Sequence, residues 1–219
     1  MDYFIDTNVA IAYSFFLDKH HISASNFFSE TNDDIYWSNN VFREYEDIYY
    51  EIFEAIEFFF DKVFLELLSS DEVFLNKYSF EKFVLINTKQ SDLSIDKKLK
   101  LIDIFWEEIL SGIFQEKMNF ITYFENFSNE IPFEFIRNKN YLLEKINLYD
   151  CGLDNYKKYV DLLKLLLKSH VHKPDYKIIL DAHDFARDTL AVFVTFDKKL
   201  FNAVKGIDKL NIDGYRLLN

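Results

Sequence analysis

Short apolar runs precede amphipathic segments at both ends of the chain. Tyr3-Phe4-Ile5 is such a run, and apolar residues recur at helical spacing after it. The same order returns at Ile35-Tyr36-Trp37, which precedes a helical pattern that reaches about Leu68. The run most typical of a strand is Ala191–Thr195, and a helix is expected over 198–204. Strands that alternate with helices predict a parallel sheet with helices on its faces.

The middle of the chain lacks this alternation. From about 51 to about 170 the pattern is helical, so we expect a large all-α insertion there. Residues of about 1–50 and 171–219 would build the rest of one domain, with Ile212–Leu218 as its last strand. The predicted fold is therefore α/β: a three-layer α/β/α sandwich with a small parallel sheet, in a single domain over 1–219.

Acidic residues follow the predicted strands. In parallel sheets, ligand sites lie at the carboxyl ends of the strands. Asp6 and Asp197 each come directly after an apolar strand, so both should reach the same edge of the sheet. Glu44 lies six residues after Ser38, on the first turns of the helix that follows the second strand. We expect Glu44 to face that edge as well.

A fourth acid comes from the helix that begins at Pro174, which offers two candidates. A turn of about 100° per residue sets Asp175 on the apolar stripe of this helix, whereas Asp181 lies about 120° away. An acid that leads an apolar stripe points inward, so Asp175 is preferred and Asp181 is the reserve. Further along, Asp184 falls on the far side, and His183 with Asp184 is expected to form an exposed pair.

Carboxylates brought together repel one another unless a cation lies between them, and oxygen ligands suit Mg²⁺ or Mn²⁺. Such ions serve the hydrolysis of phosphodiesters. Short polar groups beside the acids are suited to orienting a ligand carboxylate or a metal-bound water. Because most acids lie on the surface or cap helices, a capping role remains open for each one. The predicted ligands are Asp6, Glu44, Asp175 and Asp197, with Asp181 in reserve, and the supporting residues are Thr7, Asn8, Ser38 and Thr195.

Four segments resemble the PIN-domain nucleases, which include the VapC-like toxins of toxin–antitoxin pairs. The segments are Phe4–Asn8, Ser38–Glu44, Asp175–Ala182 and Phe193–Asp197, and they occur in the family's order. The resemblance implies an α/β/α sandwich and a Mg²⁺- or Mn²⁺-dependent endoribonuclease. Its catalytic and metal-binding acids would be Asp6, Glu44, Asp175 and Asp197. RNA would be the substrate, and an antitoxin protein or a second copy of the chain would be a partner.

The net charge of −12 opposes binding of nucleic acid through a broad basic face. Metal binding would neutralise part of this charge, and a local cluster of Lys198, Lys199 and Lys205 could guide the substrate. A catalytically inert PIN-like binding or scaffold protein that acts through its helical insertion is the alternative. A phosphohydrolase is less well supported, because Asp6-Thr7-Asn8 lacks the second Asp of an Asp-x-Asp motif.

The chain is expected to be cytoplasmic and to make no membrane contact. No apolar run approaches the roughly 18 residues of a membrane span, and the first residues lack the basic segment of a signal peptide. A single cysteine, Cys151, excludes an internal disulfide and is expected to be a packed thiol.

Overall fold

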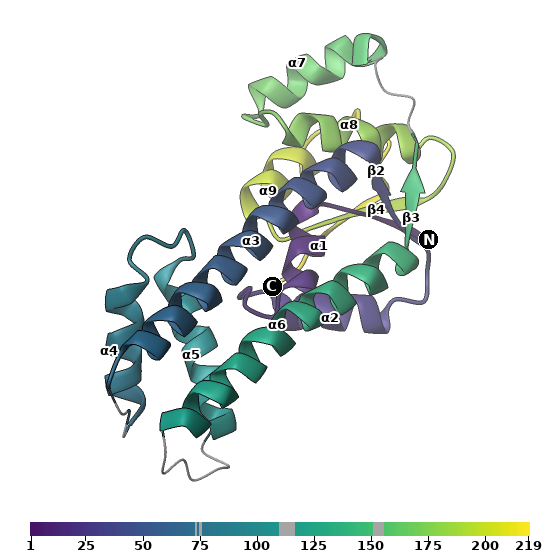
Figure 1. Cartoon of the computed structure of the whole chain (residues 1–219). Coiled ribbons are helices and arrows are strands. Elements are labelled where there is room, and N and C mark those ends of the chain that lie inside the picture. Colours follow the sequence, from purple (N-terminus) through teal and green to yellow (C-terminus); the bar gives the residue numbers. More distant parts are fainter. Residues whose placement is uncertain (73, 75, 110–116, 151–155) are drawn as a thin grey trace. The chain divides into compact units, whose positions relative to one another are not determined.

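The computed structural model describes the chain except for residues 73, 75, 110–116 and 151–155, so Cys151 lies outside the described residues. Helices and strands alternate near both termini, and helices occupy most of the middle (Figure 1). In chain order the elements are β1 (Asp2–Ile5), α1 (Thr7–Ser14), α2 (His21–Glu30), β2 (Ile35–Ser38), α3 (Asn39–Ser69), α4 (Lys77–Asn87), α5 (Ile95–Ile109), α6 (Lys117–Lys145), β3 (Ile146–Tyr149), the 3-10 helix η1 (Tyr156–Tyr159), α7 (Val160–Lys168), α8 (Asp175–Phe185), β4 (Ala191–Thr195), α9 (Lys198–Lys205) and β5 (Gly214–Leu217).

Five parallel strands form one sheet in the order β3-β2-β1-β4-β5. The central strand β1 pairs with β2, where Tyr3 lies opposite Ile35, and with β4, where Phe4 lies opposite Phe193. Every residue of β4 is buried, which explains why this strand has the clearest apolar pattern in the sequence. The predicted α/β class and parallel sheet are confirmed.

β3 was not predicted, because it falls in the region expected to be entirely helical. It pairs with β2 at the edge of the sheet, where Ile35 lies opposite Ile146 and Ser38 lies opposite Tyr149. Its four residues, Ile-Asn-Leu-Tyr, follow α6 directly, so no turn residue separates the strand from the helical pattern before it. The prediction of an all-α segment as far as about residue 170 is therefore wrong at this strand.

Helices lie on both faces of the sheet. Successive residues of a strand point to opposite faces, and Tyr3 makes an edge contact with Phe27 of α2, with 5.5 Å between the ring centroids. Its neighbour Phe4 contacts Phe185 of α8, with 5.7 Å between the centroids. α2 therefore covers one face and α8 the other, as in a layered α/β/α arrangement (Figure 1).

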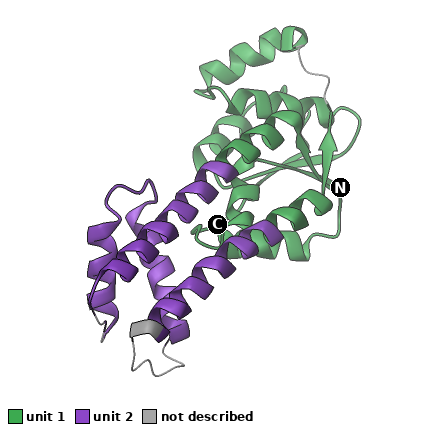
Figure 2. Ribbon diagram, viewed as in Figure 1, with its two compact units in different colours: residues 1–48, 138–219 green, residues 49–137 purple. Residues whose placement is uncertain are grey.

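The chain divides into two compact units (Figure 2). Unit 1 comprises 1–48 and 138–219 and contains the whole sheet. Unit 2 comprises 49–137, and its described elements are all helical. Phenylalanine rings form much of the core of unit 2, such as Phe80 against Phe105 at 5.4 Å and Phe105 against Phe124 at 5.1 Å.

Hydrophobic side chains on α3 are divided between core and surface. Phe59 and Phe60 are buried, whereas Phe58 is 51% exposed. Among the described residues, no helix combines the length and the hydropathy that crossing a bilayer requires.

Candidate functional site

Asp6 lies where the central strand ends and α1 begins. Its Oδ1 accepts a hydrogen bond from the Thr7 backbone N–H at 2.8 Å, so the carboxylate caps α1. The backbone N–H of Asp6 donates to Val194 O at 2.9 Å, which ties the end of β1 to β4. Asp6 is only 5% exposed. The sheet therefore places a buried carboxylate between two neighbouring strand ends.

Thr195 connects Asp6 to Asp197. The Thr195 hydroxyl, on the last residue of β4, donates to Asp6 Oδ2 at 2.7 Å. The same Oγ1 accepts from the backbone N–H of Asp197 at 2.9 Å. Asp197 Oδ1 in turn caps α9 by accepting from the backbone N–H groups of Lys199 and Leu200. The first and the last of the predicted acids thus belong to one hydrogen-bonded network.

Asn8 holds this network from the opposite side. Its Nδ2 donates to Asp6 Oδ2 at 2.6 Å and to Thr195 Oγ1 at 3.1 Å. Its Oδ1 accepts from the backbone N–H of Phe196 at 3.0 Å. The amide therefore fixes the orientation of both side chains.

Thr7 connects Glu44 to the helix that begins next to Asp6. The Thr7 hydroxyl donates to Glu44 Oε2 at 2.6 Å, so the residue next to Asp6 contacts the helix that follows β2. Ser38, the fourth predicted supporting residue, has a different role. Its buried Oγ accepts from the backbone N–H of Val41 at 3.3 Å and caps the start of α3.

Asp175 interacts with the other predicted acids through its charge. It is the first residue of α8 and is half-buried. Burial raises its pKa, and the charges of Glu44 and Asp197 raise it further, while His172 lowers it. Burial likewise raises the pKa of Asp6 to about 7; the charges of Asp175 and Glu44 add to this effect, and the hydrogen bonds from Thr195 and Thr7 oppose it. The charges of Glu44 and Asp197 thus lie near enough to disfavour ionisation of Asp175, and those of Glu44 and Asp175 near enough to disfavour ionisation of Asp6.

The reserve acid, Asp181, lies in a second polar network. It is fully buried, and its Oδ2 accepts from Asn40 Nδ2 at 2.8 Å. Its Oδ1 accepts from the Tyr156 hydroxyl at 3.1 Å. These contacts join α8 to the start of α3 and to η1, whereas the charge interactions of Asp175 are with Glu44 and Asp197.

His183 and Asp184 do not form an exposed pair, so that prediction is wrong. His183 is 5% exposed, and its Nδ1 accepts from the backbone N–H of Asn211 at 2.9 Å. Asp184 is 8% exposed and accepts from Lys158 Nζ at 2.9 Å and from the Tyr159 hydroxyl. η1 therefore packs against the side of α8 that was expected to face water.

Oxygen donors make up the group around Asp6, which is the ligand chemistry of Mg²⁺ and Mn²⁺. As the side chains stand in the part of the chain that the structure describes, no three His, Cys, Asp or Glu residues are grouped so that they could hold a metal ion. Asp6, Glu44 and Asp197 instead accept hydrogen bonds from the protein. The site is therefore a group of acidic side chains whose oxygens are hydrogen-bonded to neighbouring protein groups.

The chain was compared with protein families, curated proteins and solved structures. No protein-family model, no curated protein and no solved structure matches this chain significantly. Any assignment of function therefore depends on the residues themselves.

Proposed function

We propose that this chain is a Mg²⁺- or Mn²⁺-dependent endoribonuclease with a PIN-like three-layer fold, in which Asp6, Glu44, Asp175 and Asp197 form the catalytic metal site. The observation that carries the proposal is the hydrogen-bonded group at the strand ends, in which Thr195 connects Asp6 to Asp197 and Thr7 contacts Glu44. Burial raises the pKa values of Asp6 and Asp175, and repulsion from neighbouring carboxylates raises them further. A dication would remove this repulsion. RNA is the proposed substrate, on the resemblance of the four acidic segments to PIN-domain nucleases.

The chain's own residues would orient the site. Thr195 and Asn8 fix the Asp6 carboxylate, and Thr7 positions Glu44. A bound ion would supply the positive charge that acidifies water and neutralises a phosphodiester. The proposal requires the half-buried side chains of Glu44, Asp175 and Asp197 to approach Asp6 further when the metal ion binds.

Two exposed lysines, Lys198 and Lys199, directly follow Asp197 and are suited to contacting RNA phosphates. Besides RNA, the proposed binding partners of the chain are an antitoxin protein and a second copy of the chain.

Cleavage of fluorescently labelled single-stranded and structured RNA with Mn²⁺ tests the proposal. We expect Asp6→Asn and Asp197→Asn to reduce the cleavage rate by about 10² or more, because each removes a charge from the site. Asp188→Asn, which changes an exposed acid just after α8, serves as the matched control and should cleave at the original rate. Cleavage that survives both site changes would exclude this site.

The second candidate is a catalytically inert PIN-like binding or scaffold protein that acts through its helical insertion. It is favoured by the hydrogen bonds that the acids already accept within the protein. This candidate predicts no cleavage and little metal affinity. A thermal shift with Mn²⁺ that disappears in Glu44→Gln would contradict it.

A further inference from the structure

Most of the negative charge of this protein belongs to unit 2. Residues 49–137 contain 17 Asp and Glu but only 9 Lys and Arg, which gives a net charge of −8 out of the −12 of the whole chain. The part of α3 that lies in this unit, from Tyr49 to Ser69, contains five acids and one lysine, Lys62. An acidic surface of this kind attracts cationic partners and repels anionic ones.

One face of α3 combines this charge with exposed apolar side chains. Phe58 is 51% exposed, Leu65 is 61% exposed and Leu68 is 52% exposed, although these are residues that proteins usually bury. Three exposed acids share their face. The six side chains recur at alternating steps of three and four and fall within an arc of about 100°. This face, called the α3 stripe below, consists of Glu51, Glu54, Phe58, Asp61, Leu65 and Leu68.

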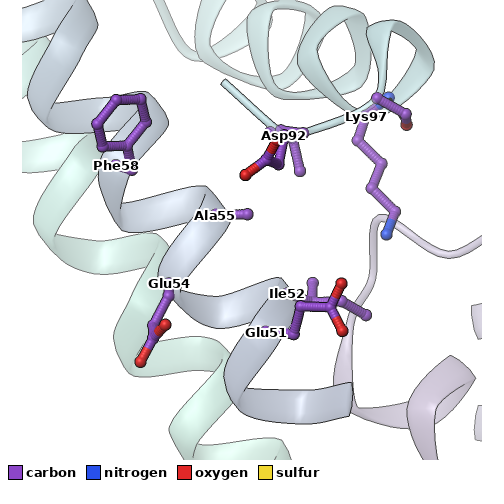
Figure 3. A pocket seen from close by; sticks show the side chains of 9 residues that line it. Glu51, Ile52, Glu54, Ala55, Phe58, Asp92 and Lys97 are labelled. Atoms are coloured by element: carbon purple, nitrogen blue, oxygen red, sulfur yellow. Dashed lines mark hydrogen bonds between the residues drawn. The ribbon is translucent and has the colours of Figure 1, made fainter. Parts of the chain in front are cut away.

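A groove of about 610 Å³ lies beside the N-terminal half of the α3 stripe. Its apolar lining comes from Ile52, Ala55 and Phe58 of α3 and from Leu93 in the segment before α5. Figure 3 shows Glu51 and Glu54 on α3 and Asp92 and Lys97 on the α5 side, around the same hollow. The groove therefore offers apolar surface bordered mainly by carboxylates.

The charges on and beside this face exclude several classes of occupant. A second copy of the chain would place its own acidic stripe against this one, and the phosphates of RNA or of a lipid surface would meet the same repulsion. The repulsion already acts within α3, since burial and the neighbouring charges of Asp61 and Glu54 raise the pKa of Glu57. A cationic and apolar partner is the complementary one.

We propose that the α3 stripe and its groove dock an amphipathic helix of another protein, with a stripe of apolar side chains flanked by lysine and arginine. Residues 51–68 span about 26 Å of helix, enough for five turns of a partner. Apolar residues at steps of three and four are the positions that a helix lying along another helix or in a groove would contact. The inference is independent of the nuclease proposal, because it uses no residue of the candidate metal site.

Binding of synthetic peptides to the full chain tests this inference. The probe is a helical peptide of about 18 residues with leucine at steps of three and four and lysine elsewhere. One comparison peptide has glutamate in place of lysine, and another has the same composition in scrambled order. Titration calorimetry gives the affinities, and hydrogen exchange of α3 locates the site.

We expect the Leu/Lys peptide to bind, to slow exchange over 51–68, and to bind at least about tenfold more tightly than either comparison peptide. Phe58→Ala combined with Leu65→Ala should weaken binding about tenfold, and Glu51→Gln combined with Glu54→Gln should reduce its dependence on salt. Matched controls are Ile22→Ala and Glu30→Gln, two exposed positions on α2 that should leave the affinity unchanged.

Three results would overturn the inference. The first is equal affinity for the ordered and scrambled peptides, which would mean nonspecific attraction between charges. The second is an unchanged affinity in the Phe58→Ala, Leu65→Ala variant. The third is self-association of the chain, or binding of an RNA oligonucleotide, that this double variant abolishes.

Discussion

Asp6 couples the stability of the protein to pH. Its pKa is raised from 3.8 to about 7, mainly by burial. Between these values the folded chain binds a proton that the unfolded chain has lost, so this group lowers stability as pH rises through the window. We expect the free energy of unfolding to fall from pH 4 to pH 8, by up to ~1.4 kcal/mol per pH unit from this group. Urea denaturation at a series of pH values should show a smaller fall in Asp6→Asn, and equal slopes would contradict this assignment.

Thr195 supports the site through a hydroxyl that is fully buried. It donates to Asp6 and accepts from Asn8 and from the backbone of Asp197. Thr195→Val keeps the shape but removes these three hydrogen bonds and takes the acceptor from the backbone N–H of Asp197, so we expect a loss of about 1–3 kcal/mol in the free energy of unfolding. Thr195→Ser keeps the hydroxyl and should retain Mn²⁺ affinity better than the valine variant. A valine variant as stable as the original chain would show that the network contributes nothing.

At the level of elements, the strands that carry candidate ligands could be predicted because the sheet buries them. Ala191–Thr195 is buried throughout, and the run around Phe4 and Ile5 ends in a buried pair. β3 could not be predicted, because it is only four residues long and follows α6 directly, with no turn residue between them. The burial of Asp184 could not be predicted either. Asp184 accepts hydrogen bonds from Lys158 and Tyr159 of η1 and from Tyr149 of β3, and spacing within one helix does not reveal this packing.

Asp184 is expected to hold η1 and α7 against α8. Burial opposes its ionisation, but hydrogen bonds from Tyr159 and Lys158 hold the pKa of Asp184 below its ordinary value. Asp184→Asn should therefore cost about 1–3 kcal/mol at neutral pH, since it removes the charge that accepts the hydrogen bonds of Tyr159 and Lys158. Hydrogen exchange should accelerate over 156–168 in this variant.

The exposed neighbour Asp188 provides the control for that experiment. Asp188→Asn should leave exchange over the same residues unchanged. Folding favours the ionised form of Asp184, so this carboxylate stabilises the folded protein. The stabilisation is complete above the pKa that Asp184 has in the unfolded chain, and it is lost as the pH falls through the lower pKa of the folded protein. Equal exchange in the two variants at neutral pH would contradict a role for Asp184 in holding these helices.

In the molecule as a whole, the sequence correctly indicates that the strands before Asp6 and Asp197 end at the same edge of the sheet, because parallel strands all end at that edge. Asp6 and Asp197 are 191 residues apart in the chain and are connected through the Thr195 hydroxyl. Side-chain orientation could not be predicted in the same way. Asp181 turns toward Asn40, 141 residues away in the chain, because a hydrogen bond between two helices decides this direction.

Binding of Mn²⁺ by the four carboxylates is the central claim, and titration calorimetry measures it directly. The account predicts one class of site, whose affinity falls at least about tenfold in Asp6→Asn and in Glu44→Gln but not in Asp188→Asn. Binding should release about half a proton per site at pH 7, because Asp6, with a pKa of about 7, is then about half protonated before the ion enters. The absence of Mn²⁺ binding, or binding that is equally strong in all three variants, would contradict the account.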